Sequence, residues 1–411
     1  MKLAIVFGAC VVLTSACGSS STPPPGMGAA GNTSSGGAAP SGGAPSSSGG
    51  ASGSAPVVTA GAPPVAMGTP GVWEKVTSPD MDPELFTNGN FGIGSVVTDP
   101  KRPNELYVGG YGSLWKSIDY GLEWSKVDSK PNPESLALGH VVAVAGTTPA
   151  TVWMASANGA EHVYKSTDAG LTFTLTGAIP EQPDAASLYS IVVDPNDATH
   201  LISGLHEQDK LVESIDGGAT WKFVSGTGWV SGGKSWFPFF IDTGDAATTR
   251  NTWFAIAQDG ASASMTSDGG KNWAKPKGVE NLTHPHGVSG LYQSGKVLMV
   301  AGLGATAGDG IYRSNDLGLS WTRVAEGRGA LVWGSAKTLY SMWGWACGGC
   351  GLDEGGPELR TAPQPGDTWT KGTVPDALDW GPNSVATTSD GNHAVYVGSM
   401  WATGLWRFVE P

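Results

Sequence analysis

A short polar motif recurs five times along this 411-residue chain. Each copy reads Ser or Thr, any residue, Asp, any residue, Gly, two further residues and then an aromatic side chain. Successive Asp residues lie 49, 48, 52 and 48 positions apart, a period that suits one four-stranded blade of a β-propeller. The repeat therefore predicts an all-β chain divided into similar sheets. The repeated residues are Asp119, Asp168, Asp216, Asp268 and Asp316.

Two weaker copies extend the repeat at both ends. The sixth copy has lost its polar residues but keeps Gly366 and Trp369, the latter 48 positions after Trp321. The seventh is represented by Trp73, which lies 51 positions before Trp124. The sequence therefore predicts seven blades.

The two chain ends complement each other. Residues 73–76 match the outermost strands of other repeats, but no inner strands precede them. Three strand-like segments without a fourth occur at 383–388, 393–398 and 405–409. We therefore expect a seven-bladed β-propeller whose last blade combines the N-terminal outermost strand with three C-terminal strands, which removes free sheet edges.

The first 70 residues predict export and a tether. A short basic start, an apolar run over 3–13 and small residues up to Ala16 have the layout of a signal peptide at 1–16. The residues before Cys17 resemble a bacterial lipobox, although Thr14 stands where Leu is commonest. An ordinary secretory signal cleaved nearby is the alternative. The resemblance implies a lipidated Cys17 and an outer-membrane or cell-surface lipoprotein of a Gram-negative bacterium.

Composition separates this tether from the body. Residues 17–70 are mostly Gly, Ser, Ala, Pro and Thr and cannot bury enough apolar area to fold, so we expect a disordered linker. The body, 71–411, carries 22 basic and 36 acidic residues, a net charge of −14. A groove for nucleic acid is therefore excluded, because binding phosphates needs clustered Lys and Arg. The membrane is expected as a partner only through the lipid anchor, and the protein is expected to be a monomer.

The body holds two cysteines, Cys347 and Cys350. A four-Cys zinc site is impossible with one pair, and no other pattern indicates a metal or a cofactor. Because exported proteins are oxidised, we expect a local disulfide that stiffens this loop.

The five Asp motifs resemble the Asp-box repeat of sialidases, family-74 xyloglucanases, sortilin-type receptors and photosystem-assembly propellers, over residues 71–411. The resemblance implies that the Asp side chains cap the turn between the third and fourth strands and are structural. Two departures put a direct transfer of activity in doubt. Sialidases use three Arg around a substrate carboxylate, whereas Arg328 is the only Arg expected on the site face. Family-74 xyloglucanases have two propellers, and this chain has one.

We expect the site on the face of the ring opposite the Asp motifs. On that face each blade is entered, and its second and third strands are connected. Aromatic and hydrogen-bonding side chains on a concave face suit sugars, which stack on indole and bond to amides and carboxylates. The predicted substrate-binding residues are Trp236, His206, His286, Trp343, Trp380 and Asn383.

Two chemistries are open at that face. Hydrolysis would need two carboxyl groups, about 5–5.5 Å apart for retention or about 6.5–9.5 Å for inversion, and Asp259 with Asp379 is the predicted pair. Elimination from uronic acids would need a base and a group that neutralises the carboxylate, for which His140, Tyr189 and Arg328 are candidates.

The sequence thus predicts a cell-surface propeller that acts on or binds extracellular carbohydrate, with a polysaccharide or glycoconjugate as partner. A glycoside hydrolase or polysaccharide lyase is one reading, and a non-catalytic carbohydrate-binding, protein-binding or assembly-factor propeller is the alternative. The substrate, and whether a lipoprotein would face the periplasm or the outside, stay open.

The lipobox resemblance can be tested directly. Replacing Cys17 by Ser should move the protein from the membrane to the soluble fraction, because the thiol that would carry the lipid is lost. Fractionation of cells expressing either form, followed by immunoblotting, measures this. Wild-type protein that is already soluble would contradict the prediction.

Overall fold

The computed structural model describes the body of the chain with short gaps. The described residues are 68–81, 92–110, 113–127, 141–155, 162–179, 188–258, 263–284, 290–305, 307–343, 357–375, 378, 381–388, 390, 394–399 and 404–411. All of them belong to one compact unit, Ala62–Pro411. The predicted signal peptide, almost all of the tether and Cys17 lie outside these residues.

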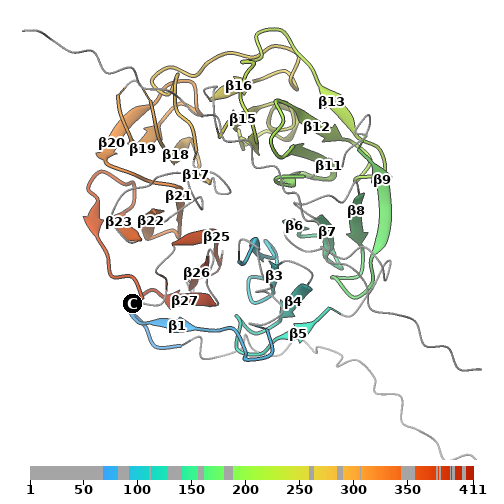
Figure 1. The fold of residues 1–411 in the computed structure, drawn as a ribbon, viewed down its shortest axis with the longest axis vertical. Helices are drawn as coiled ribbons and strands as arrows, with labels where there is room; N and C mark the ends of the chain where they lie inside the picture. Colours follow the sequence, from blue (N-terminus) through green and yellow to red (C-terminus); the bar gives the residue numbers. More distant parts are fainter. Residues whose placement is uncertain are drawn as a thin grey trace, which may run out of the picture. The chain divides into compact units, whose positions relative to one another are not determined.

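Seven small antiparallel sheets form a ring around a central axis (Figure 1). The first blade contains β2 (Ser95–Thr98), β3 (Leu106–Gly110), β4 (Ser113–Ser117) and β5 (Ser125–Lys126). The second contains β6 (Val141–Ala145), β7 (Thr151–Ala155), β8 (His162–Ser166) and β9 (Thr174–Ala178). The third contains β10 (Val192–Asp194), β11 (Asp197–Gly204), β12 (Leu211–Ser214) and β13 (Lys222–Val224).

The remaining blades follow in chain order. The fourth contains β14 (Phe237–Phe240), the one-turn helix α2 (Ala246–Thr249), β15 (Trp253–Ile256) and β16 (Ser264–Thr266). The fifth contains β17 (Leu291–Ser294), β18 (Val297–Gly302), β19 (Gly310–Ser314) and β20 (Thr322–Glu326). The sixth contains β21 (Leu331–Gly334), β22 (Thr338–Trp343), β23 (Glu358–Pro363) and β24 (Thr370–Lys371). The seventh contains β25 (Pro382–Thr387), β26 (Ala394–Ser399), β27 (Leu405–Val409) and β1 (Trp73–Lys75).

The predicted closure of the ring is confirmed. Strand β1 pairs with β27, with Trp73 opposite Phe408 and Lys75 opposite Trp406. Just beyond this ladder, the backbone N–H of Val76 donates to Leu405 O at 2.8 Å. Figure 1 shows β1 beside β27, next to the C-terminus. The last blade therefore joins segments more than 300 positions apart in the sequence and leaves no inner strand unpaired.

The fourth blade departs from the pattern. In the first, second, third and fifth blades the fourth strand begins just after the aromatic residue of the motif. The fourth blade has three described strands, and after Trp273 only an isolated bridge joins Met265 to Ala274. Pro276 follows two residues later and has no N–H to donate to a ladder, which explains why the strand ends at one bridge.

Each Asp motif forms a tight turn, called here the Asp turn, after the third strand of its blade, and in the first, second, third and fifth blades this turn leads into the fourth strand. In the second blade, Ser166 Oγ accepts the N–H of Gly170 at 2.8 Å and donates to Asp168 Oδ1 at 2.6 Å. Asp168 Oδ1 in turn accepts the N–H of Thr172 at 2.9 Å. The same pattern recurs around Asp119, Asp216, Asp268 and Asp316.

These hydrogen bonds favour the ionised form of the carboxylate. The side-chain amide and backbone N–H of Asn272, with the hydroxyl of Thr266, lower the pKa of Asp268 to about 2. At Asp168, burial works in the opposite direction, but the hydroxyls of Ser166 and Thr172 and the backbone N–H groups outweigh it, and the pKa is lowered.

The backbone of the turn is left-handed at two successive residues. In the second blade these are Ala169 at φ 60° and Gly170 at φ 85°. The glycine adopts this conformation at little cost, whereas a residue with a Cβ does not. Tyr120 and Leu317 occupy the same strained position in their own turns, at φ 61° and 58°.

The Asp turns also connect neighbouring blades. Ala169 O accepts hydrogen bonds from two side chains of the first blade, Tyr107 Oη at 3.0 Å and Lys116 Nζ at 3.1 Å. Across the closure, Tyr120 O likewise accepts from Tyr396 Oη at 3.0 Å and from an Arg407 guanidinium nitrogen at 2.8 Å. We call this contact, made from the second and third strands of one blade to the next Asp turn, a blade joint.

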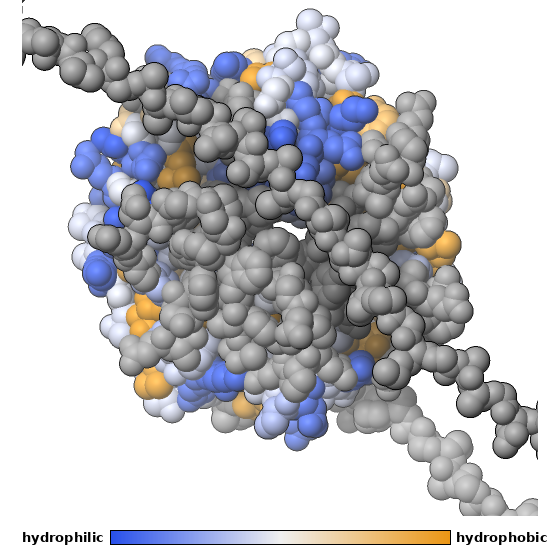
Figure 2. All heavy atoms as spheres, in the orientation of Figure 1, coloured by the Kyte–Doolittle hydropathy of each residue, from blue (hydrophilic) through white to orange (hydrophobic). Residues whose placement is uncertain are grey.

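Among the described residues, no helix is long and apolar enough to cross a bilayer. Figure 2 shows hydrophilic side chains over much of the described rim, with separate hydrophobic patches between them. Several of the exposed apolar side chains belong to Asp turns, namely Ile118, Leu122, Leu171, Ile215 and Leu319.

Ring closure predicts a clear effect of truncation. A chain that begins at residue 79 lacks β1 and should melt roughly 5 °C or more below a chain that begins at Ala62, since each kcal/mol lost shifts Tm by about 2–4 °C. Differential scanning calorimetry of the two chains measures the difference. The longer chain is the matched control because it lacks the same tether. Equal melting temperatures would contradict closure by β1.

Candidate functional site

The innermost strands of all seven blades enclose a cavity of about 310 Å³ on the ring axis. Its lining mixes apolar side chains, such as Val141 and Leu331, with polar ones, such as Ser95 and Ser384. Tyr189, just before β10, and Asn383, near the start of β25, also line it. Both residues lie where their blades are entered, on the face where the sequence predicted a site, and we call this end of the cavity the mouth.

Two of the predicted residues lie in contact at this mouth. The rings of Tyr189 and His206 have centroids 5.0 Å apart, and both side chains are half-buried. Phe237 packs against Tyr189 at 4.8 Å and against His284 at 4.6 Å. The third and fourth blades therefore contribute an aromatic cluster at the edge of the cavity.

His284 is buried in this cluster, and its position follows from a hydrogen bond. Its Nε2 lies 2.9 Å from Ser235 O, and its backbone N–H donates to Ala257 O at 3.0 Å. The ring thus braces the entrance of the fourth blade and packs nearly perpendicular to the ring of Phe237.

Asn383 and Arg328 reach the same face from other blades. Asn383 lies in β25, lines the cavity and is 6% exposed. Arg328 is exposed, and its guanidinium lies 5.6 Å from the ring centroid of Trp343. The described contact of Arg328 lies within the sixth blade and does not join it to the Tyr189 cluster.

Trp343 is not the open stacking platform that the sequence suggested. It ends β22, pairs with Glu358 and is 7% exposed. Its ring packs in the core of the sixth blade, and the Arg328 guanidinium covers a face of it. A ligand can therefore reach little of the Trp343 ring, because this residue ends a buried strand and does not stand in a free loop.

The structure also corrects the prediction that Trp236 stacks on a sugar. Its side chain is 0% exposed, and its ring lies 4.3 Å from that of Trp229. The indole Nε1 donates to Asp209 Oδ1 at 2.9 Å. Trp236 therefore fills the space between the third and fourth blades and does not offer a face to a sugar.

Asp209 is the centre of a network that the sequence did not reveal. Besides Trp236, it accepts the indole N–H of Trp229 at 3.2 Å and the backbone N–H of Gly232 at 2.7 Å. The loop that follows is fixed by Ser235, which is buried at φ 52° and accepts the N–H of Glu207 at 2.8 Å. Glu207 is left-handed as well, at φ 53°. Because neither Ser235 nor Glu207 is a glycine, no residue-type pattern marks this turn.

Several predicted residues lie outside the described part of the chain, so the proposed carboxyl pair, the disulfide and part of the lyase set stay predictions. They are Asp259, Asp379, His140, His286, Trp380, Cys347 and Cys350. Within the described ranges, no group of three or more His, Cys, Asp or Glu side chains is placed to hold a metal ion.

Comparison with curated proteins gives sequence relatives that are all named xyloglucanases. The chain is 27% identical over 252 residues to a xyloglucanase of a Paenibacillus species, covering 56% of this chain and 20% of the relative. It is 32% identical over 183 residues to xyloglucanase Xgh74A of Acetivibrio thermocellus, covering 38% of this chain. The chain thus spans about a fifth of the relatives' length, 20% in both cases. No family model matches the chain.

Comparison with solved structures supports the fold. A GH74 xyloglucanase from Xanthomonas campestris superposes with a TM-score of 0.60 at 17% identity, over 82% of this chain and 53% of that one. A YCF48 structure described as bound to D1 peptide superposes with a TM-score of 0.53 at 13% identity, over 85% of this chain and 100% of that one. At these identities the likeness establishes a shared propeller fold.

The Asp209 network predicts a stability effect with a matched control. Asp209→Ala should lower the free energy of unfolding by about 1–3 kcal/mol, because it leaves indole N–H groups without their acceptor. Glu207→Gln, on the same turn but exposed, should change it little. Urea denaturation followed by tryptophan fluorescence measures both. Equal effects of the two substitutions would show that the network is not structural.

Proposed function

We propose that this protein is an exported propeller that binds an extracellular polysaccharide of the xyloglucan type at the mouth of its central cavity. The observation that carries the proposal is the sequence relationship to xyloglucanases, which extends over 252 residues at 27% identity. Fold alone would not select a ligand, since unrelated functions share propellers.

The described side chains at the mouth suit binding of a sugar chain. Tyr189 and His206 supply ring faces and hydrogen-bonding edges, and Asn383 supplies an amide at the cavity wall. Such mixtures bind sugars because C–H groups pack on rings while hydroxyls bond to polar groups. The acidic body favours a neutral glucan over an anionic one.

Hydrolysis is a second candidate because the relatives are named for it. Asp259 and Asp379 would be the carboxyl pair. Two described carboxylates of the same rim, Asp209 and Asp309, are a poorer choice. Asp209 is held by three N–H donors, and Asp309 accepts the N–H of Gly304 at 2.9 Å.

Elimination from uronic acids is less favoured by the described geometry. It would use Tyr189 with Arg328, but Tyr189 packs between the third and fourth blades while Arg328 packs on Trp343 in the sixth. A peptide-binding role, suggested by the fold shared with the YCF48 structure, remains the alternative from a different class.

The proposed location follows from the N-terminus. We propose that Cys17 is lipidated and that the tether holds a monomeric propeller away from an outer membrane. A flexible segment of about 50 residues reaches roughly 40 Å root-mean-square, enough for the mouth to meet a polymer outside the membrane surface.

Binding to xyloglucan is tested by affinity electrophoresis and calorimetry, with a reducing-end assay on the same samples. Wild type should bind, and Tyr189→Leu should bind roughly threefold to tenfold more weakly, because a ring contact contributes about 0.5–1.5 kcal/mol. Asp119→Asn, at an Asp turn on the opposite rim, is the control and should leave affinity unchanged. Release of reducing ends that is lost in Asp259→Asn and Asp379→Asn would establish hydrolysis. No binding to xyloglucan or other neutral glucans would refute the proposal.

A further inference from the structure

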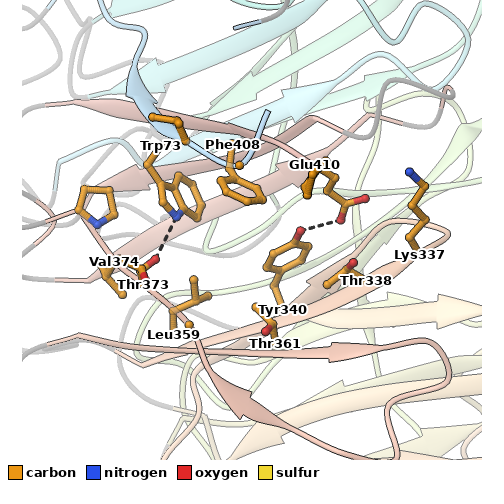
Figure 3. Close-up of a pocket in the computed structure, with 15 residues that line it drawn as sticks. Trp73, Lys337, Thr338, Tyr340, Leu359, Thr361, Thr373, Val374, Phe408 and Glu410 are labelled. Atoms are coloured by element: carbon orange, nitrogen blue, oxygen red, sulfur yellow. Dashed lines mark hydrogen bonds between the residues drawn. The ribbon is translucent and has the colours of Figure 1, made fainter. Parts of the chain in front are cut away.

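The seam of the ring contains a second cavity, of about 640 Å³, that shares no lining residue with the axial cavity. It lies where β27 ends and β1 begins, and its lining includes Gly71, Val72 and Glu410 (Figure 3). In the first, second, third and fifth blades, an Asp turn joins the third strand to the fourth at this point. No such turn links β27 to β1, because the two strands come from distant parts of the chain.

The sixth blade approaches this space as other blades approach an Asp turn. Tyr340 in β22 occupies the register position of Tyr107 and Tyr396, the hydroxyl donors of the two blade joints described above. In those joints the residue opposite the tyrosine is a cation, Lys116 or Arg407. Opposite Tyr340 stands Thr361, which lines the cavity. The seam therefore keeps the phenol of a joint and lacks its cation.

A carboxylate replaces the missing turn as the acceptor. Glu410 is 8% exposed and accepts Tyr340 Oη at 2.6 Å and Ser335 Oγ at 2.7 Å. Burial, together with the hydrogen bond to Glu410 and its negative charge, raises the pKa of Tyr340, so the phenol stays protonated and donates. Among the described residues no Lys, Arg or His forms an ion pair with Glu410, although exposed Lys337 also lines the cavity.

The other end of the cavity is apolar. The rings of Trp73 and Phe408 have centroids 5.1 Å apart, and Leu359 and Val374 complete this end. The indole is held in place because Trp73 Nε1 donates to Thr373 O at 3.0 Å. Figure 3 shows these side chains at one side and Tyr340 with Glu410 at the other. The cavity thus joins an aromatic wall to a buried negative charge.

We infer that the seam cavity binds a small organic cation, an amine, amidine or guanidine carried on a flat or cyclic apolar body. The cationic group lies at Glu410 and supplies the charge that Lys116 and Arg407 supply in other joints. The body packs against Trp73 and Phe408, where aromatic faces also attract cations. A buried carboxylate without a cation is costly, which favours such a ligand over a neutral one. This site is separate from the mouth and independent of the proposed function.

The test uses the full chain with benzamidine as probe and benzamide, its uncharged isostere, as control. Ligand-observed NMR titration to about 10 mM should detect benzamidine and show benzamide binding about tenfold more weakly or not at all. Glu410→Gln, which keeps the shape and removes the charge, should weaken benzamidine binding by about tenfold. Glu326→Gln, an exposed carboxylate on the fifth blade, should leave it unchanged.

A second variant keeps the test decisive if Glu410→Gln fails to fold. Thr361→Lys restores the cation of the other joints and should abolish benzamidine binding while the melting temperature is kept or raised. Lys337→Gln should leave affinity unchanged or increase it, because a competing cation at the entrance is removed. Equal affinity for benzamide, unchanged binding in folded Glu410→Gln or in Thr361→Lys, weaker binding in Lys337→Gln, or no benzamidine binding would each overturn the inference.

Discussion

The carbonyl of a left-handed residue in an Asp turn is the contact on which the ring depends. In the second blade this residue is Ala169, whose oxygen accepts from Tyr107 and Lys116 of the first blade. Only the left-handed backbone directs that oxygen to the neighbouring blade while the Ser166 and Asp168 side chains cap the turn. Cap and joint are therefore one structure, and the strain at Ala169 is offset by hydrogen bonds on both sides.

Because the Asp motif forms both the cap and the joint, it indicates the architecture of the protein and says little about its ligands. Each carboxylate is occupied by backbone and hydroxyl donors of its own turn, which leaves it little capacity for a substrate. The ends of the blades that carry no such turn are free to vary. At the mouth they supply Tyr189, His206 and Asn383, and at the seam they leave a cavity beside Glu410.

The fold can be predicted from the sequence because the Asp motif recurs at a regular spacing and because the two ends of the repeat are incomplete in complementary ways. Trp73 has no inner strands before it, and the C-terminal strands have no fourth, so closure follows from the sequence alone. The blade joints are not predictable in this way. Tyr107 and Ala169 are ordinary residue types, and their contact depends on how consecutive blades pack.

The site is predicted less well for the same reason. Loop position placed Tyr189 and Asn383 at the cavity, but it did not show that Trp236 and Trp343 would be buried. An indole next to a loop can pack inward or face solvent, and the outcome depends on neighbours such as Asp209. Asp259 and Asp379 lie outside the described residues, so their pairing remains a prediction.

If the Asp turns hold the ring together, ligand should bind at the mouth on the opposite face and leave the turns unchanged. Hydrogen–deuterium exchange with and without xyloglucan oligosaccharide tests this division most directly, because amide protection is read along the whole chain. We expect ligand-dependent protection in peptides covering 188–209 and 381–388, and none in those covering 117–124 or 314–321. Protection confined to the Asp turns would show that the two faces have been assigned the wrong way round.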